Sequence, residues 1–210
     1  MRINKFIFSW VVIVFSCIAI HSTAYAANQS DPVALLKYIA NNMIAGLKAN
    51  KATLKTKPQI VYNLAYKYVV PYADTMAMSK QVLSPQVWNS ASPQQRMQFQ
   101  KEFTTTLIRT YASALTSYQD QVVEFYPPRG DYQRSNMVEV NSEISSSQGE
   151  PIRVSYRLIR VGSVWRLFDL SVEGVSMLES FRSQFSDILS QGDIDKLLQR
   201  MAAHNNRRAD

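Results

Sequence analysis

Apolar residues recur at helical spacing through the first half of this chain. Downstream of a predicted N-cap at Asp31, the apolar positions that fall three or four residues apart are Leu36, Ile39, Met43 and Leu47. This spacing predicts one amphipathic helix. Similar patterns predict two shorter helices over residues 58–70 and 74–83.

A longer helix is expected to begin at Ser92, whose side chain can accept a hydrogen bond from the Gln95 amide while the Gln95 side chain returns one. Apolar and aromatic residues then follow at intervals of four or three, namely Phe99, Phe103, Leu107, Tyr111, Leu115 and Tyr118. This stripe would be about 30 Å long at about 1.5 Å per residue. It can either fill a core or line a ligand cavity.

The alternation typical of strands replaces the helical pattern after Asp120. The segments expected to form strands are residues 121–126, 137–144, 152–159 and 164–172. Because short turns join them, neighbouring strands should pair antiparallel in one meander. Helical spacing returns over residues 178–189 and 194–201. Helices, then a four-stranded sheet, then helices predict an α+β fold.

The N-terminus has the pattern of a secretory signal peptide. A basic start precedes an apolar run over residues 6–20, and a small-residue cleavage site ends at Ala26. Cleavage there removes Cys17, the single cysteine, which matches a lipoprotein processing site only loosely because the apolar run continues past it. The expected organisation is a cleaved signal peptide, a single domain and a loose polar tail over residues 1–26, 27–204 and 205–210, respectively.

The charge balance narrows the candidate chemistry. Loss of Arg2 and Lys5 with the signal peptide lowers the formal net charge from +7 to +5. A basic exported chain suits anionic phospholipid headgroups better than nucleic acid. The densest basic group, typical of a solvated helix end, comprises Lys48, Lys51, Lys55 and Lys57. Without a cysteine, and with His204 alone in the tail, the mature sequence offers no thiol nucleophile, and no Ser-His-Asp triad or histidine metal site unless that tail folds back.

The most distinctive segment is residues 164–176, which read Val-Trp-Arg-Leu-Phe-Asp-Leu-Ser-Val-Glu-Gly-Val-Ser. This segment resembles the signature of the MlaC family, the periplasmic phospholipid shuttles of the maintenance-of-lipid-asymmetry system, also called toluene-tolerance proteins. The helical block from Val82 to Tyr118 follows the spacing of the same family, so the resemblance extends over most of the mature chain. Ser84 departs from it, since the family commonly has glycine after Val-Leu.

The resemblance implies a fold and a function. The fold would be a curved, four-stranded, largely antiparallel sheet of the nuclear-transport-factor-2-like type, packed against N- and C-terminal helices. The family holds a phospholipid by its acyl chains and carries it between an outer-membrane lipoprotein–porin complex and an inner-membrane ATP-driven transporter, which maintains outer-membrane lipid asymmetry. We therefore expect a periplasmic monomer with phospholipid as its bound ligand, and no catalytic activity, cofactor, metal or nucleic-acid partner.

Apolar residues of the long helix, the strands and the first C-terminal helix are the candidate lipid-binding residues. They are Phe103, Leu107, Tyr111, Leu115, Val140, Val154, Tyr156, Leu158, Val172, Val175, Leu178, Phe181 and Phe185. The pattern alone is equally consistent with a filled core, because apolar spacing does not reveal whether a gap remains between two layers.

Two other functions fit parts of the sequence. An exported enzyme acting on a small apolar substrate could use Asp169 or Glu173 as general base, although these positions are more typical of a strand end and a turn. A structural adaptor that docks through its basic surface would bind no ligand. Trp165 is expected in the core, and Arg153 and Arg157 on a solvated sheet face unless they meet a phosphate.

Overall fold

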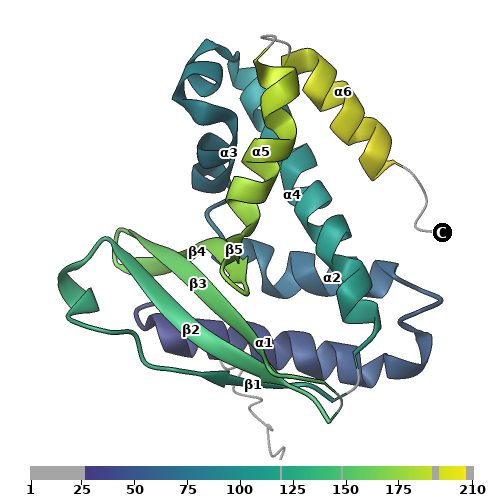
Figure 1. Cartoon of the computed structure of the whole chain (residues 1–210), viewed down its shortest axis with the longest axis vertical. Coiled ribbons are helices and arrows are strands. Elements are labelled where there is room, and N and C mark those ends of the chain that lie inside the picture. The colour runs from purple at the N-terminus through teal and green to yellow at the C-terminus, as the bar shows by residue number, and fades with distance from the viewer. Residues whose placement is uncertain (1–26, 119, 148, 191–193, 207–210) are drawn as a thin grey trace, which may run out of the picture.

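The computed structural model describes residues 27–118, 120–147, 149–190 and 194–206 (Figure 1). The predicted signal peptide and the last four residues of the predicted tail lie outside this part of the chain. The fold is α+β, as the sequence predicts. None of the described helices combines the length and the apolar character needed to cross a membrane.

Six α-helices lie within the described residues. Their bounds are α1 Pro32–Ala49, α2 Gln59–Tyr68, α3 Thr75–Ser90, α4 Pro93–Thr116, α5 Met177–Leu189 and α6 Ile194–Asn205. Both predicted N-caps are confirmed. The Asp31 carboxylate accepts hydrogen bonds from the amides of Val33 and Ala34, and Ser92 forms a complete capping box with Gln95.

Helix α3 continues to Ser90, although the sequence predicts an end near Leu83. A kink separates its two parts, since Ser84 has φ 67° and ψ 154° and Pro85 follows directly. Proline cannot donate the backbone hydrogen bond that a straight helix needs, so the chain bends and starts a second helical segment. That segment carries Trp88 into the core among the helices.

The described strands form one antiparallel sheet in the order β1–β2–β3–β4–β5. They are β1 Val122–Phe125, β2 Met137–Ser145, β3 Ile152–Val161, β4 Val164–Val172 and β5 Val175–Ser176. The predicted meander is confirmed, but the predicted count of four strands is wrong. β5 escapes the sequence pattern because two residues are too few to show alternation. The nuclear-transport-factor-2-like type stays a prediction.

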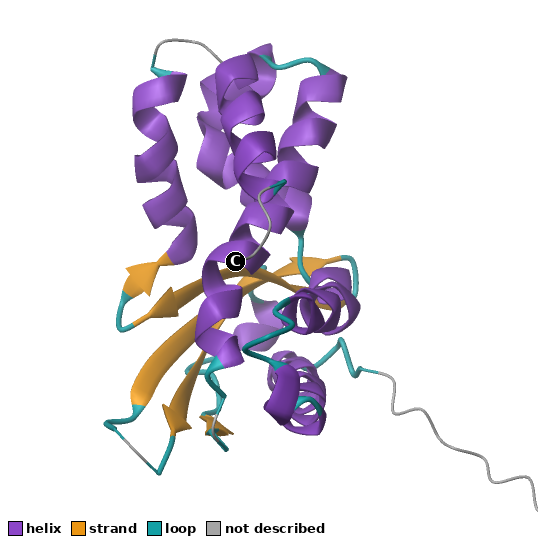
Figure 2. Cartoon of the chain, turned by 90° about the vertical axis from the view of Figure 1, so that its right-hand side faces the viewer, coloured by secondary structure: helices purple, strands orange, loops and turns teal. Residues whose placement is uncertain are grey.

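One face of the sheet packs on α1. Val140 pairs with Tyr156 and Val138 pairs with Leu158, and all four side chains contact or join the apolar cluster that α1 completes. We refer to this side as the helix-covered face and to the opposite, more polar side as the open face. Figure 2 shows α1 and α2 on one side of the strands and most of the other helices above them, while the C-terminal end of α4 reaches down to the level of α1 (Figure 1).

A register shift redirects one side chain of β4. Leu158 pairs with Leu167, but Arg157 pairs with Asp169, so Phe168 is an extra residue on β4. Leu167 therefore packs against α1, whereas Phe168 packs among the helices. The shift connects the sheet to the helical layer.

The molecule has two main cores. The sheet core, between the sheet and α1, comprises Leu35, Leu36, Ile39, Met43, Val138, Val140, Leu158, Trp165 and Leu167. The helical core, among α3, α4, α5 and α6, comprises Met78, Val82, Leu83, Trp88, Phe99, Phe103, Leu107, Phe168, Leu178, Phe181, Phe185, Leu197, Leu198 and Met201. Trp165 is buried, which confirms its predicted place in the core.

Helix α6 extends one residue into the predicted tail. The side-chain amide of Asn205 donates to the backbone carbonyl of Glu102, at 2.9 Å, and to its carboxylate, at 2.7 Å. Asn205 also accepts a hydrogen bond from the Thr106 hydroxyl. The end of α6 is thus fixed to the middle of α4 rather than loose.

Candidate functional site

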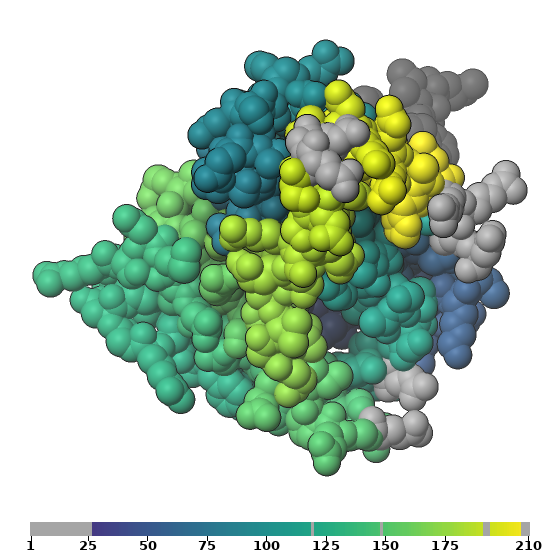
Figure 3. Space-filling view, turned by 45° about the horizontal axis from the view of Figure 1, so that its top comes forward, coloured from purple at the N-terminus to yellow at the C-terminus, as the bar shows by residue number. Residues whose placement is uncertain are grey.

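An opening leads into the molecule between its two layers (Figure 3). The C-terminal part of α4 forms one side of it, and the β4–β5 turn with the start of α5 forms the other. Strand ends close it below, and α1 is visible at its floor. The opening therefore leads from the surface toward the helix-covered face of the sheet.

Aliphatic side chains are exposed on the segments around this opening. Val172 pairs with Val154 on β3 and with Val175 on β5, so the three share the helix-covered face, and Ile152 lies two residues before Val154 on the same face. The exposed fractions are 36% for Val172, 63% for Val175 and 45% for Ile152. Leu115, near the end of α4, is 37% exposed. These four exposed residues are the apolar rim.

Two half-buried tyrosines add apolar surface behind the rim. Burial raises the pKa of Tyr111, and the negative charge of Asp169 raises it further. Burial also raises the pKa of Tyr156, although the hydrogen bond that the Ser142 hydroxyl donates to it, at 3.2 Å, acts in the opposite direction. The Tyr156 ring lies 5.6 Å from that of Phe125. Such aromatic surface with few polar groups suits an apolar ligand.

The structure distributes the predicted lipid-binding residues over three places. Those in the helical core are Phe103, Leu107, Leu178, Phe181 and Phe185. Those on the helix-covered face of β2 and β3 are Val140, Val154, Tyr156 and Leu158. Those on the segments that border the opening are Tyr111, Leu115, Val172 and Val175. They do not form one continuous lining, because the first group packs on itself, with the Phe103 and Phe181 rings 5.4 Å apart.

Sequence reasoning assigned no residue of α1 to the site. Ile39 and Met43 of α1 nevertheless belong to the sheet core, and α1 is visible at the floor of the opening. Ile152 of the rim was also omitted. The amphipathic pattern of α1 was the available signal, but periodicity does not tell which layer an apolar helix face meets.

Asp169 fixes the junction of the sheet with α5. It is 1% exposed and accepts hydrogen bonds from the Arg157 guanidinium, from the Ser176 hydroxyl at 2.6 Å and from the Leu178 amide at 3.2 Å. Asp169 thus has a structural role at the end of β4, with donors from β3, β5 and α5. The expectation of a solvated Arg157 is wrong, because the register shift places its guanidinium beside this carboxylate.

Glu173, the second carboxylate considered as a general base, also has a structural contact. It lies in the β4–β5 turn with φ 47° and accepts a hydrogen bond from the Arg153 amide at 2.6 Å. Its side chain is half exposed and lies 3.8 Å from the Arg153 guanidinium. Both carboxylates are thus engaged in holding the ends of β3, β4 and α5.

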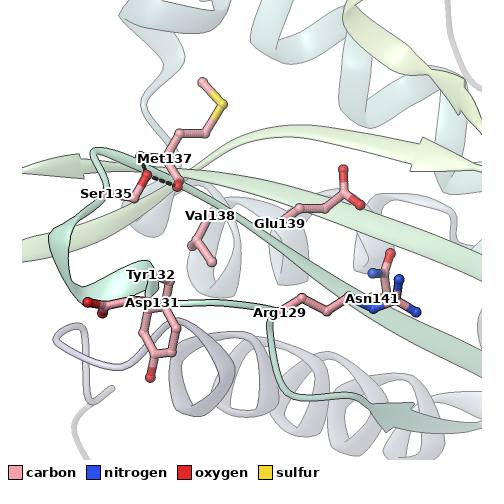
Figure 4. Close-up of a pocket in the computed structure, with 8 residues that line it drawn as sticks. All are labelled: Arg129, Asp131, Tyr132, Ser135, Met137, Val138, Glu139 and Asn141. Carbon is pink, nitrogen blue, oxygen red and sulfur yellow. Dashed lines mark hydrogen bonds between the residues drawn. The ribbon is translucent and has the colours of Figure 1, made fainter.

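The open face carries two pockets of different character. One, of about 460 Å³, lies beside the loop before β2 (Figure 4). Its lining includes Arg129, Asp131, Glu139 and Asn141. The other, of about 520 Å³, shares Arg129 and Asn141 with it and adds charged groups such as Arg153. The charged and amide groups suit water or polar ligands. The second pocket is also lined by Tyr126, Pro127 and Val154, the last of which is a predicted lipid-binding residue.

The described part of the chain contains residue types that could bind a metal ion. There, no three histidine, cysteine, aspartate or glutamate residues cluster as a metal ion would require.

Sequence comparison identifies the family. The profile of the family described as "MlaC protein" matches residues 37–203. The chain belongs to the MlaC family. The resemblance noted in residues 164–176 is thereby confirmed. Within this MlaC family member, the matched region includes α1 from residue 37 onward and all of the rim.

Individual MlaC relatives agree with this assignment. The chain is 27% identical over 158 residues to toluene tolerance protein ttg2D of Pseudomonas putida, covering 74% of this chain and 73% of that protein. It is 26% identical over 197 residues to the intermembrane phospholipid transport system binding protein MlaC of Haemophilus influenzae, covering 91% and 90%.

A solved structure resembles this MlaC family member closely. It is that of the phospholipid-binding protein from Ralstonia solanacearum in complex with a phospholipid. The TM-score is 0.75 at 29% sequence identity, and the match covers 82% of this chain and 95% of the Ralstonia chain. The likeness therefore includes both layers of the fold.

Proposed function

We propose that this MlaC family member is a periplasmic phospholipid carrier. The acyl chains enter the opening and lie against the helix-covered face of the sheet, while the headgroup stays outside. The carrier moves lipid between an outer-membrane lipoprotein–porin complex and an inner-membrane ATP-driven transporter and so maintains outer-membrane lipid asymmetry. The opening with its exposed apolar rim carries the proposal, in a family whose Ralstonia relative is in complex with a phospholipid.

The physical requirement for such a carrier is large. A two-chain phospholipid has about 30 methylenes, and exposing each to water costs about 0.8 kcal/mol, so the whole lipid would cost more than about 20 kcal/mol. Since the chains are already dry in the bilayer, an apolar space that matches that environment suffices. No covalent step or cofactor is needed for transport.

The residues proposed to contact the chains are those that border the opening or lie behind it. They are Tyr111, Leu115, Val154, Tyr156, Val172 and Val175. The predicted residues of the helical core instead support the walls, because they pack on one another. Binding alone accounts for this function, since Asp169 and Glu173 are engaged in structural contacts.

Native mass spectrometry of the mature chain, purified without added lipid, tests the proposal. We expect a protein peak that carries the mass of a phospholipid, and release of that lipid on denaturation. Repeated recovery of folded, lipid-free protein that also takes up no lipid from vesicles would contradict it.

Substitutions at the rim test the location. Leu115→Glu and Val172→Glu each place a charge where acyl chains would pass, so we expect the lipid-bound fraction to fall severalfold. Both side chains are about one-third exposed, so the folded state should tolerate them. Met97→Glu, on the same helix as Leu115 but 66% exposed elsewhere, is the matched control and should keep its lipid. If circular dichroism shows unfolding whenever lipid is lost, the rim residues belong to the core instead.

A further inference from the structure

Basic and aliphatic side chains gather at one end of the molecule. The apolar rim surrounds the opening, as described above. Four exposed lysines lie at the end of α1 and in the segment that follows it, namely Lys48, Lys51, Lys55 and Lys57. The sequence pattern suggested only a solvated helix end for them, and the proposed carrier function gives them no role.

Packing places these lysines beside the opening. Lys51 Nζ lies 2.9 Å from the Asp120 carboxylate, just beyond the end of α4. Leu54, between the lysines, is buried in a small cluster with Ala112 and Tyr118 from the same end of α4. The lysine segment therefore abuts the part of α4 that carries Leu115 and forms one side of the opening.

The acidic groups at this end leave positive charge in excess beside α4. Hydrogen bonding and charge from Lys51, with a smaller effect of Lys48, lower the pKa of Asp120, so this carboxylate stays ionised and is already paired. On the side of the opening opposite α4, Glu173 forms an ion pair with Arg153. Three further acidic side chains lie on the sheet side of the opening rather than beside α4. Glu124 and Glu143 lie opposite each other in the strand register, on the open face, and Glu150 lies in the β2–β3 loop.

We propose that this end docks directly on an anionic phospholipid bilayer, with the apolar rim entering the headgroup–acyl boundary and Lys48, Lys51, Lys55 and Lys57 contacting the headgroups. The proposal rests on the carrier function, since it gives the opening its orientation. Exposed aliphatic groups flanked by lysines are the combination that binds an anionic interface, because the aliphatic groups leave water while the cations stay at the phosphates.

Docking in this orientation has a consequence for lipid entry. The opening would face the bilayer, so acyl chains could pass between two apolar environments without crossing water. An extraction rate limited by hydration of the chains would therefore rise on a surface that the rim can enter. A protein partner is the other possible occupant, and protein-free vesicles separate the two.

The test is co-sedimentation of the mature, lipid-loaded protein with protein-free vesicles. We expect binding to vesicles of phosphatidylcholine containing about 30% phosphatidylglycerol, at least about tenfold weaker binding to pure phosphatidylcholine, and marked weakening between low and high salt. Absence of binding to the anionic vesicles at low salt would overturn the proposal.

Paired charge reversals locate the surface. Lys55→Glu with Lys57→Glu should weaken vesicle binding at least about tenfold. Lys37→Glu with Lys101→Glu changes the net charge equally, but Lys37 lies more than about 15 Å back along α1, and this variant should bind nearly as the parent does. Equal loss in both double variants would show a non-specific charge effect and overturn the assignment of the surface.

The same preparations distinguish this proposal from the carrier function. Their lipid content, read by native mass spectrometry, should be equal in the parent and in both double variants, because none of these lysines borders the acyl chains. Lipid-loaded protein that ignores vesicles would remove the docking surface and leave the carrier function intact. Protein that never carries lipid would remove the carrier function whatever its vesicle binding.

Discussion

Ser84 holds a backbone conformation that side chains rarely adopt. Its φ of 67° with ψ of 154° lies in a region used almost entirely by glycine. Glycine, which the family resemblance implies at this point, would adopt this conformation without strain. The kink is thus kept by the surrounding packing of α3, with its neighbours Val82 and Leu83 fully buried in the helical core.

Ser84→Gly should stabilise the protein by about 1 kcal/mol. The substitution removes backbone strain from the folded state, and this gain outweighs the greater conformational entropy of glycine in the unfolded chain. The midpoint of thermal unfolding should rise by about 2–4 °C. Ser84→Ala is the matched control: it keeps the Cβ atom and should give no such gain. A fall in the midpoint for Ser84→Gly would show that the serine side chain stabilises the kink.

Tyr156 makes stability sensitive to alkaline pH. Burial raises its pKa in the folded state, so the folded protein favours the neutral phenol. The stabilisation by the neutral phenol is fully present below the pKa of tyrosine in the unfolded chain, about 10, and is lost as the pH rises through the higher pKa of the folded state. We expect the free energy of unfolding to fall less between about pH 9 and pH 11 in Tyr156→Phe than in the parent. Parallel denaturation curves at these pH values measure this, and equal losses would contradict it.

The element most completely predicted from sequence is α4. Its capping box at Ser92 and its apolar stripe both depend on local spacing, which one sequence displays. β5 and the Phe168 register shift could not be predicted, because each is imposed by neighbouring strands rather than by a local pattern. The opening is similarly invisible, since the same stripe from Phe103 to Leu115 serves the core at one end and the rim at the other.

The junction between β4 and α5 depends on Asp169. Asp169→Asn removes the ionic partner of Arg157 and replaces one acceptor oxygen with a donor, so we expect a loss of about 2–3 kcal/mol, less than for a fully buried pair because Arg157 is one-third exposed. Chemical denaturation measures this loss.

Glu173→Gln is the matched control at the other carboxylate. Its ion pair with Arg153 is long and exposed, so the substitution should cost less than about 0.5 kcal/mol. Equal costs for the two substitutions would show that the buried junction contributes no more than a surface pair.

At the scale of the whole molecule, each layer has its own buried cluster. Among the described residues, the buried members of the sheet core and of the helical core are different, although Ala73 packs against both, and the opening lies where the layers meet. The proposed lipid would therefore lie between two layers that are each already packed around a core of their own.

Removing the lipid should lower stability without unfolding the protein. A ligand present at about a hundredfold excess over its dissociation constant stabilises the folded state by about 2.7 kcal/mol. Extraction of bound lipid should then lower the thermal midpoint by about 5–10 °C, with far-ultraviolet circular dichroism unchanged and the midpoint restored by added phospholipid. Loss of the helical signal on extraction would show that the lipid is part of the core.

The separation of the two cores bears on how often one molecule can be used. Each layer keeps its own buried cluster, so neither layer should unfold when the proposed lipid leaves. Because neither layer needs the proposed lipid for its packing, the proposed carrier should stay folded after releasing one lipid and be ready to take up another.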